Sequence, residues 1–416
     1  MPEENNISAN VSTGRLVFYL TRISTSIPVP NAQIIVTTTE EPDQILYTLV
    51  TNSSGQSEVL ELPTPPFSYS QSEDNPRPYA TYNFTIYAEG YEPITIQAGE
   101  VFPAVTSIQP VELIPIRVGT GAVDILIPPH TLYGDYPAKI PEAEIKPVEE
   151  TGEIVLSRVV IPEYVVVHDG APTNRNAPDY YVPYKDYIKN VVSSEIYSTW
   201  PESAIYANTL AIMSFTLNRV YTEWYRNRGY NFTITSSTAY DQKFIYGRTI
   251  YSNIDRIVDS IFSNYLSRPG VKQPIFTSYC NGTSVTCRGL SQWGSKYLAD
   301  EGYTPIEILR YYYGEDLYIN STDQIDGIPA SWPGTNLTIG SRGSKVLQMQ
   351  RQLNRIARSY PALPTISADG IYGPGTANAV MSFQRIFNLP ATGVVDFATW
   401  YEISNIFVGV TEIAEP

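Results

Sequence analysis

Residues 187–201 read YIKNVVSSEIYSTWP, and the rest of the chain is interpreted from this stretch. Its apolar residues recur at three- and four-residue spacing, which predicts an amphipathic helix with a stripe made of Ile188, Val191, Val192 and Ile196. Glu195 lies seven residues after Ile188 on the same stripe, so we expect its carboxyl to be buried. Burial raises the pKa of an acid, which is one requirement for a general acid near neutral pH. From spacing alone, a core glutamate paired with an arginine is the more common arrangement.

The length and the net charge limit the number of domains and the classes of partner that the protein can have. At 416 residues the chain is expected to form two to four domains. A net charge of −15 argues against nucleic acid and against an anionic membrane surface as partners. No run approaches the roughly 20 apolar residues of a membrane span. The first 14 residues, MPEENNISANVSTG, are polar and acidic, so no signal peptide is visible and the export route stays open.

Cysteine and histidine are scarce. Cys280 and Cys287 stand in CNGTSVTC and could form a disulfide, remain free or supply half of a metal site. A disulfide would suit an extracytoplasmic protein. His130 and His168 are the only histidines, which weakens a zinc peptidase and a Ser-His or Cys-His nucleophile. A carboxylate-driven reaction needs no histidine, so no metal and no cofactor is expected.

Pattern and composition predict a multidomain chain: an N-terminal β-sandwich, a central mixed α+β domain and a small C-terminal three-helix bundle. Short strands separated by turn residues indicate the sandwich, and proline with glutamate indicates an extended connector. The predicted segments are a flexible lead (1–13), the β-sandwich (14–116), an acidic proline-rich connector (117–160), the α+β domain (161–320), a linker (321–336), the three-helix domain (337–408) and a tail (409–416).

Several helices of the central domain have start and stop signals. A long helix is expected after Pro201, with a capping box from Thr199 and Glu202 and an end at Gly229. A third helix is expected over about 251–266. Two shorter ones follow, one ended by Gly302 and one with a capping box of Thr304 and Glu307.

Three blocks in the central domain carry a resemblance: YIKNVVSSEI followed by WP, then YDQKFIYG at 240–247, then GLSQWGSKYLADEGYTPIEILRYYYG at 289–314. In this order they resemble the stage II sporulation protein D family. Its enzymatic members are lytic transglycosylases of peptidoglycan, and related members are non-catalytic amidase enhancers. The resemblance implies that the central domain is of a catalytic type and that Glu195 is the catalytic acid. Two positions depart from the family: residues 213–217 read MSFTL where Arg-Thr-Tyr-Ala-Leu is usual, and Asp241 replaces a Cys that some members use for zinc.

The flanking domains carry resemblances of their own. Residues 337–408, with IGSRGSKVLQMQRQL, SADGIYGPGTANAVMSFQRIFNL and ATGVVDFATW, resemble the peptidoglycan-binding type 1 domain. Its wall contacts are predicted at Asp369, Gly370 and Tyr372, which could equally be turn residues that hold the fold. Residues 14–116, with GRLVFYL, IPVPNAQIIV, TNSSGQSEVLELP and YNFTIYAEGYEP, resemble the carboxypeptidase regulatory-like fold. That segment is expected to be a scaffold, an adhesion module or a plain spacer.

The resemblance implies a reaction that needs one carboxylate. Glu195 protonates the glycosidic oxygen after N-acetylmuramic acid and then takes a proton from the sugar's own primary hydroxyl, which leaves an anhydro-muramyl end. Substrate contacts are predicted at Trp200, Tyr240, Gln242, Tyr246, Ser291, Gln292 and Trp293. Core packing and helix capping are the competing roles for each of them.

The sequence therefore predicts a peptidoglycan-binding lytic transglycosylase that acts on glycan strands at the cell wall or spore cortex. One alternative is a non-catalytic wall-binding or amidase-enhancing protein. Another is a structural component of a spore layer or phage-like particle, in which the N-terminal β-domain docks to a protein assembly.

Overall fold

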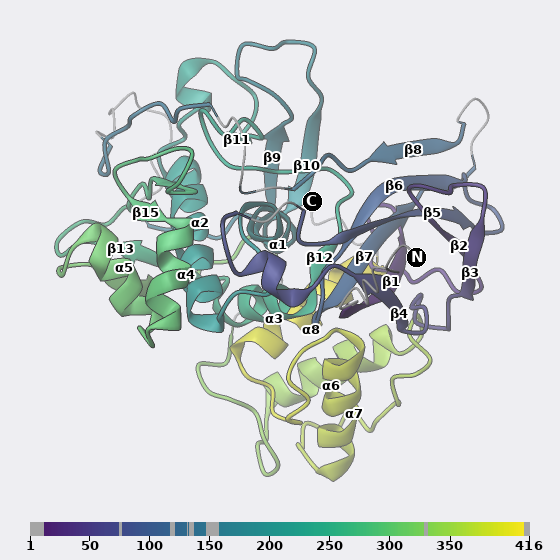
Figure 1. Ribbon diagram of the computed structural model, residues 1–416. Coiled ribbons are helices and arrows are strands. Elements are labelled where there is room, and N and C mark those ends of the chain that lie inside the picture. Colours follow the sequence, from purple (N-terminus) through teal and green to yellow (C-terminus); the bar gives the residue numbers. More distant parts are fainter. Residues whose placement is uncertain are drawn as a thin grey trace, which may run out of the picture.

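The computed structural model describes residues 12–74, 77–116, 121–130, 132, 137–146, 158–327 and 332–411. The chain is multidomain, with an N-terminal sheet-rich region, a mixed α/β middle and three C-terminal helices (Figure 1). Most of the predicted lead and tail lies outside the described residues. The exceptions are Ser12 and Thr13, which already belong to the first strand, and residues 409–411, which belong to the last helix.

The N-terminal region consists of two sheets that share one core. Buried side chains alternate along the strands, as in Tyr82, Phe84 and Ile86, and the rings of Phe18 and Phe84 meet edge to face at 4.9 Å between the sheets. One sheet has the order β3-β2-β5-β6-β8, with β2 (Gln33–Thr38), β3 (Ile45–Val50), β5 (Ala80–Tyr87), β6 (Ile94–Val101) and β8 (Val123–Leu126). The other has the order β12-β7-β1-β4, with β1 (Ser12–Arg22), β4 (Leu60–Thr64), β7 (Thr106–Leu113) and β12 (Ile250–Tyr251).

The second sheet does not end with the N-terminal region. Strand β12 comes from the middle of the chain and pairs antiparallel with β7, so that Ile250 lies opposite Ile108. Beside this pairing, Arg248 donates to the Glu100 carboxylate at 2.8 Å, and the Glu100 carboxylate is also 3.2 Å from Nδ1 of His130. All three side chains are buried. The sequence did not predict this seam, because Arg248 and Glu100 lie 148 residues apart.

The middle region is built around a helix that is buried on nearly all sides. This helix, α2 (Glu202–Tyr221), packs against α1, α3, α4 and α5 (Figure 1), and a helix covered in this way is expected to be apolar or neutral all round. Its neighbours are α1 (Tyr184–Glu195), α3 (Ser252–Ile261), α4 (Gln292–Asp300) and α5 (Pro305–Tyr313). The short strands are β9 (Tyr164–His168), β10 (Asp179–Pro183), β11 (Ile234–Thr235), β13 (Asn264–Ser267), β14 (Tyr279–Cys280), β15 (Leu290–Ser291) and β16 (Tyr318–Ser321). There are two short 3-10 helices: η1 (Phe67–Ser70) lies between β4 and β5 of the N-terminal region, and η2 (Arg226–Arg228) follows α2 in the middle region.

Helix ends differ from the predictions in three places. The prediction that α2 reaches Gly229 is wrong: the helix ends at Tyr221, and Glu223 adopts a positive φ of 46°. The Thr199 capping box is also wrong, because the Thr199 hydroxyl lies 2.6 Å from the Ser70 hydroxyl of the N-terminal region. Helix α3 ends at Ile261, and residues 264–267 form a strand instead. The capping box of Thr304 and Glu307 at the start of α5 is confirmed.

The C-terminal helices are α6 (Ser344–Ile356), α7 (Pro374–Ile386) and α8 (Phe397–Thr411). They dock on the middle region through buried charges. Lys185 of α1 pairs with Asp259 of α3 at 2.9 Å and also with Glu402 of α8. Within the middle region, Lys189 of α1 pairs with Asp255 at 2.6 Å and with Asp259 at 3.0 Å, and Asp255 also accepts from the side chain of Asn388, which follows α7, at 2.6 Å. Over the residues that the structure describes, no helix combines the length and apolar character needed to span a bilayer.

Candidate active site

Glu195 is the last residue of α1, and the backbone becomes extended at Ile196. The Glu195 side chain is 8% exposed. Its Oε1 accepts from the Lys243 backbone N–H at 2.7 Å and from the Tyr279 hydroxyl at 3.3 Å, and its Oε2 accepts from Nε2 of Gln292 at 3.0 Å. Among the described residues no arginine pairs with it, which distinguishes this carboxylate from a core ion-pair partner.

The loop that follows β11 presents the Lys243 N–H to Glu195, and Gln242 fixes this loop to α1 and α2. Its side-chain oxygen accepts from the Tyr187 hydroxyl at 3.0 Å and from the Thr216 hydroxyl at 2.8 Å. Its amide nitrogen donates to the Ile212 carbonyl at 3.0 Å. Gln242 is fully buried, so in this structure it positions the loop and is not available to a sugar.

Both carboxylate oxygens of Asp241, the residue before Gln242, accept hydrogen bonds. One oxygen accepts from Nε of Arg219 at 2.7 Å. The other accepts from the Tyr225 hydroxyl at 2.6 Å and from the backbone N–H and hydroxyl of Thr235 at 2.9 and 2.7 Å. An aspartate–arginine pair thus stands at the position where the resemblance led us to expect a cysteine in many family members. Over the described ranges no three His, Cys, Asp or Glu side chains gather as metal ligands.

The other side of Glu195 is built by β14 and β15, which pair in parallel and bring Tyr279 beside Leu290. Cys280 and Cys287 form a disulfide across the intervening loop. Gly289 has a φ of 146°, and a Cβ there would lie 1.8 Å from the Ser278 carbonyl oxygen. The first glycine of the GLSQWG block is therefore required for the close approach that places Tyr279 and Gln292 around one carboxylate.

The predicted sugar-binding aromatics do not line a shared cleft. Trp200 is 3% and Trp293 is 1% exposed, with ring centroids 4.9 Å apart, and the Trp200 indole donates to the Ser70 carbonyl at 2.9 Å. Tyr246 is 40% exposed and stacks on Tyr180 at 4.4 Å. Tyr240 is half-buried, and its carbonyl accepts from Arg219 at 3.0 Å.

Of the predicted polar contacts, Gln292 alone bonds to Glu195. Ser291 is the N-cap of α4, where its hydroxyl accepts from the Gly294 N–H at 2.9 Å. The sequence reasoning missed Tyr279, the Lys243 N–H and Lys139. The ammonium of Lys139 donates to the Asp241 carbonyl at 2.7 Å and lies 4.7 Å from the centre of the Tyr279 ring. Burial lowers the pKa of Lys139, although the carboxylates of Glu195 and Asp241 act in the opposite direction.

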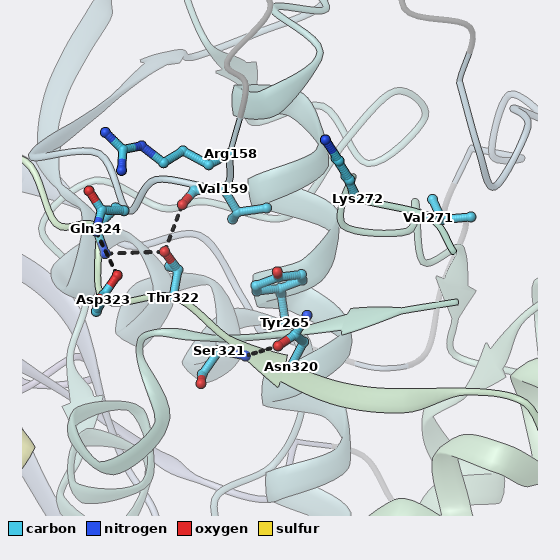
Figure 2. Close-up of a pocket in the computed structure, with 10 residues that line it drawn as sticks. All are labelled: Arg158, Val159, Tyr265, Val271, Lys272, Asn320, Ser321, Thr322, Asp323 and Gln324. Atoms are coloured by element: carbon cyan, nitrogen blue, oxygen red, sulfur yellow. Dashed lines mark hydrogen bonds between the residues drawn. The ribbon is translucent and has the colours of Figure 1, made fainter. Parts of the chain in front are cut away.

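The two cavities described lie elsewhere. Figure 2 shows the larger, of about 630 Å³, at the edge of the β13–β16 pair. Arg158, Lys272 and Asp323 line it, so its charge favours no single class of ligand. The smaller, of about 290 Å³, lies beside Trp224 and Phe232. Neither is lined by Glu195 or by a predicted substrate residue.

The residues predicted to contact the wall, Asp369, Gly370 and Tyr372, lie in a turn between α6 and α7. The Asp369 carboxylate accepts from the Ile371 N–H at 2.9 Å and from Gln350 at 3.2 Å, while Gly370 has a φ of 75°. Tyr372 is 1% exposed, and its hydroxyl donates to the Gly393 carbonyl at 2.8 Å.

Comparison with known families gives two matches. Residues 179–261 match the family described as stage II sporulation protein, and residues 342–403 match the putative peptidoglycan binding domain. Both resemblances are confirmed over these residues. The first match contains Glu195, the Asp241–Lys243 loop and β12, while the block at 289–314 lies beyond it. The carboxypeptidase regulatory-like resemblance of residues 14–116 stays a prediction.

Solved structures and curated proteins add the following. The SleB N-terminal domain is 26% identical over 18% of this chain and 99% of its own, with a TM-score of 0.17. Catechol 1,2-dioxygenase from Acinetobacter sp. ADP1 is 12% identical over 29% of this chain and 61% of its own, with a TM-score of 0.18. Chlorocatechol 1,2-dioxygenase from Pseudomonas putida is 14% identical over 28% of this chain and 60% of its own, with a TM-score of 0.16. No curated protein matches the chain.

Proposed function

We propose that the chain is a peptidoglycan-binding lytic transglycosylase that cleaves the glycan strand after N-acetylmuramic acid, at the cell wall or spore cortex. The observation that carries the proposal is the environment of Glu195: a buried carboxyl bonded to three neutral donors, with no arginine partner among the described residues. A carboxyl held in this way can exchange a proton with a substrate. The two family matches support action on the wall and binding to it.

The proposed reaction passes one proton through Glu195. The protonated carboxyl gives its proton to the glycosidic oxygen while the bond to the anomeric carbon breaks, and the electron pair leaves with that oxygen. The carboxylate then removes the proton from the primary hydroxyl of the same muramic acid. That oxygen bonds to the anomeric carbon and closes the anhydro ring. The Lys243 N–H, Tyr279 and Gln292 keep the carboxyl oriented in both steps.

The state of Asp241 favours this route over hydrolysis. A glycosidase that uses water needs a second carboxylate to activate it or to form a covalent intermediate. Asp241 lies on the loop beside Glu195, but its oxygens are occupied by Arg219, Tyr225 and Thr235. An intramolecular hydroxyl does not require a second carboxylate, which agrees with this arrangement.

The first prediction concerns the product and its dependence on Glu195. Mass spectrometry of purified peptidoglycan treated with the full chain is expected to show anhydro-muropeptides, and Glu195→Gln is expected to lower their yield at least about 100-fold because proton transfer is lost. Glu202→Gln, an exposed carboxylate at the start of α2, is the matched control and should retain activity. The proposal fails if the wild type yields no anhydro ends or if Glu195→Gln is as active as the control.

A second candidate is a non-catalytic wall-binding or amidase-enhancing protein. The observation in its favour is that Glu195 is only 8% exposed and that neither described cavity reaches it. This candidate predicts that the protein sediments with peptidoglycan, produces no new ends and behaves identically as wild type and Glu195→Gln.

A further inference from the structure

A segment of the connector, residues 137–146, is docked on the middle region, and we call it the strap. Its backbone is held at three points. The Ile140 N–H donates to the Ala239 carbonyl at 2.9 Å, and the Phe276 N–H donates to the Glu144 carbonyl at 2.8 Å. Lys146 exchanges two bonds with the Gln273 side chain, at 3.1 and 2.9 Å. The sequence predicted only an extended linker here.

The charged side chains of the strap face the middle region and its apolar side chains face solvent, which is the reverse of an ordinary packed segment. Its charged side chains, Lys139, Glu142, Glu144 and Lys146, all make contacts with the middle region. Its apolar side chains Ile140 and Ile145 are 45% and 43% exposed. Burial of apolar surface is the usual force that docks a segment, and along the strap ion pairs replace it.

Two carboxylates of the strap, Glu142 and Glu144, form ion pairs with arginines of the middle region, and we call each of these ion pairs a latch. Glu142 receives two bonds from Arg219, at 2.6 and 2.7 Å, and pairs with Lys146 at 3.2 Å. Glu144 receives two bonds from Arg268, at 2.7 and 2.9 Å. Bidentate pairs of this kind are specific in geometry. Glu144 is 37% exposed, so salt can screen its pair.

The strap is joined directly to the Glu195 site. Its Lys139 ammonium donates to the carbonyl of Asp241, on the loop that bonds Glu195 through Lys243. The same ammonium lies 4.7 Å from the centre of the Tyr279 ring, and the Tyr279 hydroxyl donates to Glu195. Lys139 therefore occupies the space between the two elements that hold the carboxylate.

We propose that the strap is a releasable cover of the Glu195 site, and that its release opens the site to a polymer. When the strap undocks, its charged side chains regain water and Arg219 keeps Asp241 as a partner, while the rings of Tyr279 and Phe276 lose the lysines packed over them. Release therefore has a free-energy cost, and salt lowers that cost by screening the half-exposed Glu144 pair. The cover itself is inferred from the strap contacts alone. That the entering polymer is a glycan strand rests on the proposed function.

Release is measured by hydrogen exchange on the full chain at about 0.1 M and about 1 M sodium chloride, where screening lengths differ about threefold. The amides to follow are those of Ile140, Lys146 and Phe276, because each donates across the strap interface. Their exchange is expected to rise several-fold at high salt while the amides of α2 are unchanged. The proposal is overturned if these amides exchange only together with α2 at both salt concentrations.

A variant tests the latch without touching the bonds to Glu195. Glu144→Lys places a cation against Arg268 and is expected to increase carbodiimide-driven labelling of Glu195 several-fold, read by peptide mass spectrometry. Glu61→Lys, the same charge reversal at an exposed position of β4, is the control and should label like the wild type. Equal labelling in both variants would count against the cover, provided that both retain the wild-type unfolding transition.

The two proposals can fail separately. Increased labelling and exchange without any anhydro product would keep the cover and remove the transglycosylase. Anhydro product from the wild type, with neither labelling nor exchange altered by Glu144→Lys or salt, would keep the enzyme and remove the cover. Support for both would be a higher initial rate of product formation in Glu144→Lys than in Glu61→Lys.

Discussion

At the scale of single residues, Arg219 organises the charges beneath the site. Its guanidinium is 1% exposed and bonds to Asp241, to Glu142 and to the Tyr240 carbonyl. Its buried charge is compensated by carboxylates from two segments, the loop and the strap. The arginine supplies the positive charge that balances the buried Asp241 carboxylate.

Asp241→Asn is therefore expected to be costly. Removal of one partner from a buried ion pair costs about 3–5 kcal/mol when the remaining charge is uncompensated, and because Glu142 still pairs with Arg219 we expect the lower end of that range, about 3 kcal/mol. The free energy of unfolding, measured in urea, should fall by about that amount. Asp300→Asn removes a half-exposed carboxylate that pairs with Lys296 on α4 and should cost less than about 1 kcal/mol. Equal losses in the two variants would contradict this account of Asp241.

At the scale of elements, local signals predicted helices well and their contacts poorly. Periodicity and glycine or proline signals located α1, α4 and α5, because these depend on residues within one helix. The end of α2 was missed, since no glycine or proline marks Glu223, which carries the positive φ. The predicted Thr199 cap was wrong because its hydroxyl bonds to Ser70, 129 residues away.

In the site, too, local patterns pointed to some residues, whereas contacts between distant residues were not predicted. Glu195 was proposed because it lies on the apolar stripe of a helix with a family motif, and Gln292, which the structure places beside it, because it lies in a second motif. Trp200 and Trp293 were assigned to sugar, but their burial depends partly on Ser70 from the N-terminal region. Lys139 lies in a stretch with the composition of a linker. Its position depends on ion pairs with distant residues, which no local pattern encodes.

Gly289→Ala tests how the elements around Glu195 are brought together. A Cβ would lie 1.8 Å from a backbone oxygen and would force β14 and β15 apart, so the variant is expected to lose about 2 kcal/mol or more. Wall cleavage should fall as well, since Tyr279 lies on β14 and Gln292 directly follows β15 as the first residue of α4.

Gly302→Ala is the matched control for that variant. Its φ is also positive, at 90°, but a Cβ there meets nothing within 4 Å. It should cost about 1 kcal/mol through backbone strain alone and leave cleavage intact. Similar losses of stability and activity in both variants would show that close approach is not the reason for Gly289.

At the scale of the whole molecule, buried charges join the regions to one another. Glu100 of the N-terminal region meets Arg248 of the middle and His130 of the connector. Burial lowers the pKa of His130, although Glu100 acts in the opposite direction. Burial alone would raise the pKa of Glu100, but Arg248 and His130 outweigh it and the pKa is lowered. Both groups therefore take up protons more readily in the unfolded chain than in the folded one.

The resulting pH dependence has a definite sign. Because the unfolded state binds more protons, the stability contributed by His130 is present above its unfolded pKa of about 6.5 and is lost as the pH falls below it. Glu100 acts likewise below its unfolded pKa of about 4.3. Urea unfolding should show stability falling between about pH 7 and about pH 5, with a smaller slope in His130→Asn. An unchanged slope would exclude His130 as the source.

The pairing of β12 with β7 bears on how such a chain can be cut and recombined. In sequence, the N-terminal region reads as a module that could be removed or exchanged before residue 161. In space, its sheet includes Ile250 and Tyr251, and its Glu100 neutralises Arg248. A chain that begins at residue 161 would carry an orphaned strand and a buried cation. If the N-terminal region is replaced by that of another protein, residues 248–251 must be replaced by a matching segment as well. The structural unit that can be exchanged therefore includes residues on both sides of the apparent domain boundary.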